Sequence, residues 1–187
     1  MKTNIVRYRM DLDGKQHNAT VSLMGVSFFL RIVYYFGFTR TEELGFGTLL
    51  VFLILPALLE LAFMVMIRGI RLDAAAIYSM LGAAYCLLLL VQSFWYGNLV
   101  RTILAVPAYL LCGAALMLVI MGLLNRGIAA AIFWLIIAVR FLVFMMVPYI
   151  FKLHLISMLP ELAALCGLFA LIYLMQGFRD PKEQQNG

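Results

Sequence analysis

Four ionisable residues stand inside long apolar stretches of this sequence, namely Arg31, Glu60, Arg140 and Glu161. A charge near the centre of a bilayer costs at least about 2.5–3.5 kcal/mol, so such residues usually face the interior of a helical bundle and find partners there. Two cations and two carboxylates in such a place could form structural ion pairs, bind a charged solute or carry protons. All four are therefore candidate binding residues.

Depth along the helices decides which of these charges can meet. Counted at 1.5 Å per residue, Arg31 lies about 16 Å from the inner end of its apolar stretch, and Glu60 lies about 12 Å from the inner end of the next one. The two are expected at nearly the same level and can form a pair. A purely structural ion pair and a role in binding or proton coupling are equally open for them.

The other two charges are less well matched in depth. Arg140 lies about 18 Å up its stretch, whereas Glu161 lies only about 9 Å below the outer end of its own. Glu161 is therefore expected near the outer surface or a vestibule. Arg140, without a partner at its own level, becomes the best candidate to hold an anionic group.

Three prolines interrupt the apolar stretches at intervals of about 50 residues, at Pro56, Pro107 and Pro160, and such a period is typical of an internal repeat. A proline inside a helix breaks the hydrogen-bond ladder and frees a backbone carbonyl one turn earlier. Three such carbonyls at similar depths could line a polar site. The alternative is that each proline only kinks its helix, as prolines in membrane helices commonly do.

The composition shows which elements must position these residues. Of 187 residues, 65% are hydrophobic and only 12% are charged, whereas a soluble domain carries about 25% charged residues. A membrane-spanning helix needs about 20 apolar residues, and six stretches meet that need. They cover residues 21–38, 47–67, 74–96, 102–124, 128–151 and 155–178. Because they are too long and too continuously apolar for barrel strands, the chain is predicted to be an all-α integral membrane protein.

The six helices are predicted to form three tandem helical hairpins. The prolines recur, aromatic residues end the first, third and fifth stretches, and similar short turns begin the third and fifth. With an even number of helices in each unit, the copies share one orientation and are related by an axis along the membrane normal. Small residues at helical spacing, such as Gly82, Gly113 and Gly167 with their neighbouring alanines, allow close helix packing. A central cavity and a solid bundle both remain open.

The distribution of basic residues predicts the orientation. Nine basic residues fall on the side of the two termini and three on the other side, which places both termini in the cytoplasm by the positive-inside rule. Residues 1–20 are predicted as a cytoplasmic amphipathic tail, 21–178 as the membrane domain, and 179–187 as a disordered cytoplasmic tail. Small size and the lack of a recognisable signal sequence favour the cytoplasmic (inner) membrane of a bacterium.

The predicted N-terminal tail has a pattern of its own. Residues 4–13 alternate between apolar and charged side chains, which predicts a short strand-like or interfacial segment; the alternative is a strand edge offered to a partner chain. Thr20 is predicted to cap the first helix. Gln92, Ser93 and Asn98 are interpreted as interface residues.

Catalytic chemistry finds little support in the sequence. It contains no metalloprotease, nucleophile-elbow or phosphate-loop motif, and no aspartate lies within a predicted span. The three cysteines are interpreted as buried packing residues. No catalytic residue, metal site or cofactor is predicted, and the dispersed basic residues argue against nucleic acid.

Two functions fit these features better than an enzyme does. The first is a small-solute or lipid-handling transport protein, or the membrane substrate-binding subunit of one, because charges within the spans and helix-breaking prolines mark transport pathways. The second is a non-catalytic accessory or scaffold subunit of a larger membrane complex. The expected partners are the lipid bilayer and either another membrane protein or further copies of the chain.

Overall fold

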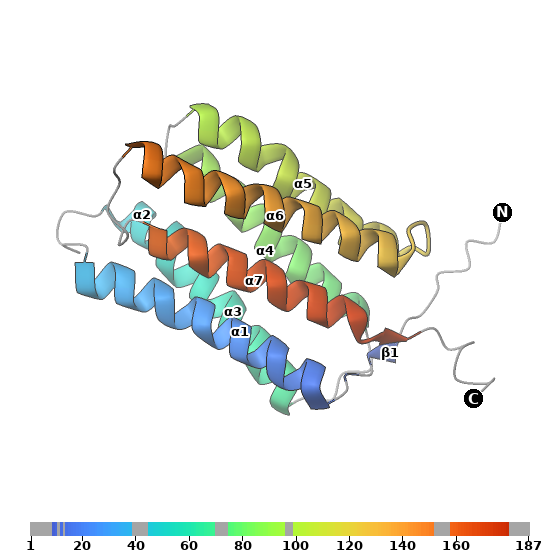
Figure 1. The fold of residues 1–187 in the computed structure, drawn as a ribbon. Coiled ribbons are helices and arrows are strands. Elements are labelled where there is room, and N and C mark those ends of the chain that lie inside the picture. The colour runs from blue at the N-terminus through green and yellow to red at the C-terminus, as the bar shows by residue number, and fades with distance from the viewer. Residues whose placement is uncertain are drawn as a thin grey trace.

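A computed structural model describes residues 9–10, 12, 14–38, 45–69, 75–95, 99–151 and 158–179, which form a bundle of long helices (Figure 1). In chain order the elements are β1 (Arg9–Met10), α1 (Gly14–Ile32), the π-helix η1 (Val33–Phe38), α2 (Phe46–Leu49), the π-helix η3 (Leu50–Ile54), α3 (Leu55–Gly69), α4 (Ala75–Trp95), α5 (Leu99–Ile120), α6 (Arg126–Phe151), α7 (Leu159–Gln176) and β2 (Phe178–Arg179).

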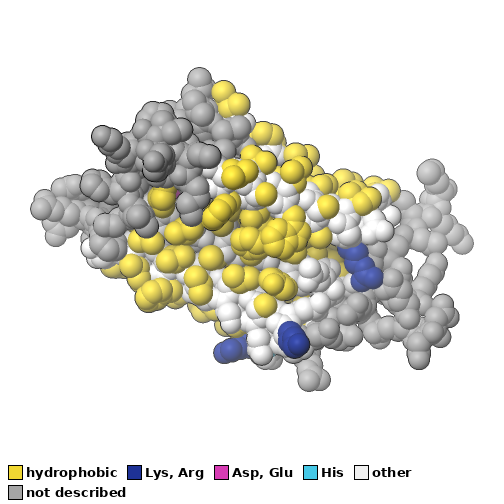
Figure 2. Space-filling model, viewed as in Figure 1, with side chains coloured by type: hydrophobic (Ala, Val, Ile, Leu, Met, Phe, Trp, Pro, Cys, Tyr) yellow, Lys and Arg dark blue, Asp and Glu magenta, His cyan; other side chains and the backbone are white. Residues whose placement is uncertain are grey.

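Within the described residues, four helical stretches are long and apolar enough to cross a membrane: Gly14–Gly37, Phe46–Arg68, Ala75–Phe94 and Leu159–Gln176. Large apolar side chains are exposed on the outside of several helices, among them Phe29, Leu58, Leu87, Leu111 and Leu135. Figure 2 shows hydrophobic side chains over the middle of the face in view, with Lys and Arg side chains near its lower and right-hand edges. A surface of this kind is suited to lipid. The predicted helical fold is thus confirmed, with four described helices that are long and apolar enough to cross a membrane, and the count of six spans stays a prediction.

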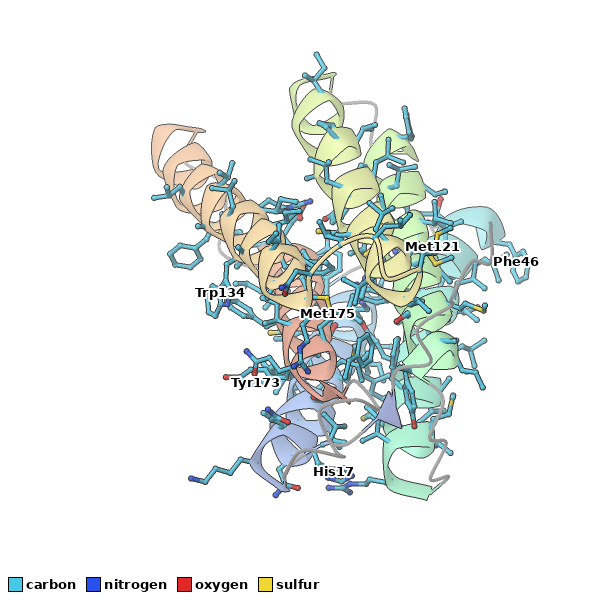
Figure 3. All side chains as sticks on the ribbon, turned by 90° about the vertical axis from the view of Figure 1, so that its right-hand side faces the viewer. His17, Phe46, Met121, Trp134, Tyr173 and Met175 are labelled. Carbon is cyan, nitrogen blue, oxygen red and sulfur yellow. The ribbon has the colours of Figure 1, made fainter. Side chains whose placement is uncertain are left out.

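Helices pack both within and between the three predicted hairpins. The most extensive contact joins α1 to α7, the first and last long helices, and α4 packs closely on α5. The pairs α1 with α3 and α6 with α7 are also in contact, but so are α5 and α6. In Figure 3, Trp134 of α6 and Phe46 of α2 lie on opposite outer sides of the bundle. The tandem-hairpin arrangement is therefore not confirmed.

Helix α1 begins before Thr20, which corrects the prediction that Thr20 caps it. Helix α1 begins at Gly14, earlier than the predicted start of the membrane domain, so the last part of the predicted tail 1–20 is helical. Thr20 does not cap this helix, because its hydroxyl donates 2.8 Å to the Gln16 carbonyl one turn back. This is the usual bond of a threonine in a helix interior.

A short strand pair lies at one end of the bundle. β1 pairs antiparallel with β2, Arg9 opposite Arg179 and Met10 opposite Phe178, and Arg126 at the start of α6 donates from Nη1 to the Phe178 carbonyl. The strand at residues 9–10 agrees with the strand-like segment that the alternating pattern predicts. It pairs with β2 of the same chain and not with a partner chain. Arg179, the first residue of the predicted disordered tail 179–187, lies in β2, and residues 180–187 lie outside the described residues.

Candidate functional site

The centre of the bundle holds a buried group of four polar side chains, which we call the Glu60 cluster. It consists of Ser27 and Arg31 from α1, Glu60 from α3 and Tyr85 from α4. Arg31 is 1% exposed and the other three are 0% exposed. Three helices thus place a cation, a carboxylate and two hydroxyls in an apolar core.

One oxygen of the Glu60 carboxylate is the centre of this cluster. Oε1 lies 2.5 Å from Ser27 Oγ, 3.0 Å from Arg31 Nε and 3.0 Å from Tyr85 Oη, and all three groups donate to it. Arg31 also donates from Nη2 to Tyr85 Oη at 3.2 Å. The ion pair between Arg31 and Glu60, expected from their matched depths, is confirmed.

Helix geometry explains why two residues of α1 reach the same carboxylate. Ser27 and Arg31 are four residues apart, so they share one face of the helix. A long side chain on a helix leans toward the N-terminal end, which brings the Arg31 guanidinium back over the turn that carries Ser27. The sequence therefore presents a hydroxyl and a cation to α3 at one level.

Helix α7 closes the cluster with its backbone. Ser27 Oγ lies 2.7 Å from the Ala163 carbonyl, so this hydroxyl has two acceptors within reach. One turn further along α7, a Cβ added at Gly167 would lie 2.2 Å from Tyr85 Oη. Because glycine has no side chain, the Tyr85 ring can lie directly against the α7 backbone and reach Glu60.

The proline at the start of α3 supplies two further acceptors. A proline has no N–H to close the turn before it, and η3, which precedes Pro56, is π-helical, a geometry often found at functional sites. Arg31 Nη1 lies 3.5 Å from the Phe52 carbonyl, and Gln92 Nε2 of α4 donates 2.8 Å to the Val51 carbonyl. Pro56 thus frees carbonyls that side chains from two other helices use.

Replacing Gln92 by Leu should test this link. We expect the free energy of unfolding in detergent to fall by about 1 kcal/mol, because the Val51 carbonyl loses the hydrogen bond that Gln92 donates. Chemical denaturation of the purified protein measures this loss. The control is Val91→Ala on the exposed face of the same helix, and an equal loss in both variants would contradict the role of Gln92.

The other two prolines differ from Pro56. Pro107 lies inside α5 and is exposed, and Pro160 lies in the first turn of α7. Proline is favourable in a first turn, where its missing N–H has no partner to lose, so Pro160 begins a helix and does not break one. Three equivalent freed carbonyls are therefore not found among the described residues; the arrangement is seen at Pro56.

The second oxygen of Glu60 has a different environment. Oε2 is buried and has no hydrogen-bond partner among the described residues. A buried polar atom without a partner costs free energy and is uncommon in folded proteins. The carboxylate is therefore used unequally, with three donors on one oxygen and none on the other.

A second polar group, the Arg140 cluster, joins α5, α6 and α7. Arg140 Nη2 donates to Glu161 Oε2 at 2.6 Å, and the Arg140 guanidinium carbon lies 4.6 Å from the centre of the Tyr109 ring. The side chains of Arg140 and Glu161 are 12% and 15% exposed. The expectation that the two are poorly matched was wrong, since their side chains form this ion pair. Glu161 is also in the first turn of α7, where a negative charge is favourable.

Replacing Glu161 by Gln should have a smaller effect than a change in the Glu60 cluster. We expect a loss of about 1 kcal/mol in the free energy of unfolding, because a partly exposed ion pair is screened by water and the Gln amide still accepts a hydrogen bond. Denaturant titration at low and high salt measures it, and the loss should shrink in high salt. A salt-independent loss of the size expected for Glu60→Gln would contradict this view of the pair.

Sequence reasoning missed several members of these clusters. Tyr85 and Tyr109 lie in apolar runs, where a tyrosine resembles any packing aromatic, although its hydroxyl is a signal in a membrane helix. Gln92 was interpreted as an interface residue, but it is 8% exposed and bonded to η3. In the described part of the chain, no three His, Cys, Asp or Glu residues gather as ligands for a metal ion.

The chemistry that these clusters can perform is binding and proton exchange. The Glu60 cluster offers a fixed cation, two hydroxyl donors and a carboxylate, all held by surrounding helices. Comparisons with protein-family models, with curated proteins and with solved structures find no match to this chain. Its function is therefore inferred from the two clusters.

Proposed function

We propose that this chain is a small-solute or lipid-handling transport protein of the membrane, or the membrane substrate-binding subunit of one, and that the Glu60 cluster is its binding site. Ionisable groups inside membrane spans commonly mark the paths of substrates, ions or protons. The observation that carries the proposal is the convergence of Ser27, Arg31 and Tyr85 on one carboxylate oxygen of Glu60, at distances of 2.5–3.0 Å.

The irregular helix beside the cluster supports transport over a purely structural role. Transporters often place their sites where a membrane helix is discontinuous and its backbone carbonyls face the site. Here η3 and Pro56 interrupt the stretch Phe46–Arg68, and the Phe52 carbonyl faces the Arg31 guanidinium. A structural ion pair alone would not need this interruption.

We further propose six spans, arranged as three tandem hairpins. Helices α5 and α6 have 22 and 26 residues, about 33 and 39 Å at 1.5 Å per residue, enough to cross a bilayer of about 30 Å. In support of a repeat, one ion pair joins the two helices of the first hairpin and another joins those of the third. The middle hairpin contributes one tyrosine to each pair, Tyr85 and Tyr109.

The proposed location is the cytoplasmic membrane of a bacterium, with both termini in the cytoplasm. Lys15, Arg68 and Arg126 belong to the side that the positive-inside rule assigns to the cytoplasm. Cysteine labelling tests the orientation: a cysteine replacing Asn125, which is exposed, should react with an impermeant reagent only after the cells are opened. Labelling of intact cells would contradict this orientation.

A ligand screen tests the function. The protein in lipid nanodiscs would be heated with members of a panel of small anions, cations, neutral solutes and lipids. We expect one class to raise the unfolding temperature. Arg31→Gln should abolish the effect, and Tyr85→Phe, which keeps the ring and removes one donor, should weaken the apparent affinity about tenfold. Leu58→Ala, on the exposed face of α3 at 56% exposure, is the control and should leave it unchanged.

The screen also separates transport from the alternative, a non-catalytic accessory subunit. A response of equal size in wild type and Tyr85→Phe would place ligand binding outside the Glu60 cluster. No response to any class, together with a membrane protein that co-purifies and stabilises the chain, would contradict transport and favour the accessory role.

A further inference from the structure

Ser27 lies within hydrogen-bond distance of two acceptors but has only one hydroxyl proton to donate. Ser27 Oγ lies 2.5 Å from Glu60 Oε1 and 2.7 Å from the Ala163 carbonyl. A serine hydroxyl has one proton, so it can donate to one of these acceptors. One further proton, shared between Glu60 and Ser27, would make both contacts hydrogen bonds.

The carboxylate charge is also incompletely stabilised. Glu60 is 0% exposed, and Oε2 is buried with no hydrogen-bond partner among the described residues. A carboxylate is an acceptor at both oxygens and carries charge on both. The charged form of Glu60 therefore has one oxygen in apolar surroundings, a cost that a neutral carboxylic acid largely avoids.

From these two observations we propose that Glu60 takes up a proton on Oε1, toward Ser27, when a small carboxylate anion replaces Glu60 as the partner of Arg31. The site then binds one anion and one proton together. This rests on the proposed transport function and names its substrate class, a small carboxylate carried with a proton.

The charges balance in this exchange. In the resting site the charges of Arg31 and Glu60 cancel. A proton from solvent forms an O–H bond on Glu60, which donates to Ser27, and Ser27 donates to the Ala163 carbonyl. Arg31 would then be a buried cation without a counter-charge, which is strongly unfavourable. The incoming anion restores neutrality, so proton and anion bind together.

The donor set explains why the anion is a carboxylate. Arg31 Nε and Tyr85 Oη already hold a carboxylate oxygen at 3.0 Å each. A guanidinium with a neighbouring hydroxyl suits the planar charge of a carboxylate. Glu60 thus occupies, in the resting state, the position that the substrate group takes.

The other groups around Glu60 do not compete for the proton. In the described part of the chain these are Ser27 and Arg31 of α1, Tyr85 of α4, and Cys166 of α7, which interacts electrostatically with Glu60. At neutral pH tyrosine and cysteine already carry their protons and arginine keeps its charge. Glu60 is the remaining group that can accept one.

The test measures binding of radiolabelled acetate, lactate and butyrate to the full chain in nanodiscs between about pH 6 and pH 8. These acids have pKa values of about 4–5, so they stay ionised over this range. One coupled proton makes the apparent affinity weaken about tenfold for each unit that the pH rises. Glu60→Gln mimics the protonated state and should bind with little pH dependence. Leu58→Ala, on the exposed face of α3, should keep the wild-type pH dependence.

A second measurement needs no variant in the cluster. Adding the bound anion to wild-type protein in weakly buffered solution should remove about one proton from solution for each anion bound, followed with a pH indicator. Binding without proton uptake, pH-independent binding by wild type, or no binding of any of the three anions would overturn the proposal. A different solute from the ligand screen that binds through Arg31 without proton uptake would support the proposed transport function and contradict the coupling of anion binding to proton uptake.

Discussion

Replacing Glu60 by Gln is expected to lower the free energy of unfolding by about 3–5 kcal/mol. The variant keeps the shape of the side chain and one acceptor oxygen, but it leaves Arg31, which is 1% exposed, without a counter-charge. Removing one partner of a buried ion pair typically costs this much because the remaining charge stays buried and uncompensated. Denaturant-induced unfolding in detergent, followed by tryptophan fluorescence, measures the loss.

A double-mutant cycle separates the pair from its surroundings. Arg31→Met should be destabilising by a similar amount, whereas Arg31→Met combined with Glu60→Leu should cost less than either single change, because two apolar side chains of similar volume leave no buried charge. Additive losses in the double variant would contradict a coupled pair. A small anion such as acetate should partly restore the stability of Glu60→Gln and should not restore that of the double variant.

The helical membrane class and the Arg31–Glu60 pair could be predicted from the sequence for the same physical reason. Apolar runs of membrane length must be helical, and consecutive antiparallel helices place residues at calculable depths. The count failed for Arg140 and Glu161 because it used the wrong helix ends: counted from Arg126 at the start of α6 and from Gln176 at the end of α7, the two residues lie about 21 and 22 Å along their helices.

The contribution of α7 could not be predicted from depth alone. Its Ala163 carbonyl and Gly167 complete the Glu60 cluster, yet α1 and α7 stand at opposite ends of the chain. Contacts between helices that are far apart in the chain depend on how side chains fit together across the whole bundle. This fit cannot be read from the apolar pattern of the sequence. The π-helix before Pro56 could not be predicted either. A proline predicts that the α-helix is interrupted, but it does not predict the geometry of the residues before it.

Gly167→Ala is expected to lower the free energy of unfolding by about 3 kcal/mol or more. The loss comes from the displacement of Tyr85 and not from a change in the helix α7 itself. The added Cβ would lie 2.2 Å from Tyr85 Oη and 2.6 Å from two carbons of its ring, which no real structure tolerates. The rigid ring must therefore move away and give up its hydrogen bond to Glu60 Oε1. Strain from overpacking and a lost bond to a charged group add in the same direction.

Two comparisons make this prediction specific. Gly113→Ala places its Cβ 3.7 Å from Cys86 Cβ, an ordinary contact, and should change the free energy of unfolding by less than about 0.5 kcal/mol while favouring the helix. In a Tyr85→Ala background the clash is absent, so Gly167→Ala should there cost no more than Gly113→Ala does. A large loss that persists without the Tyr85 ring would mean that α7 needs this glycine for another contact, and the account of how Tyr85 reaches Glu60 would be wrong.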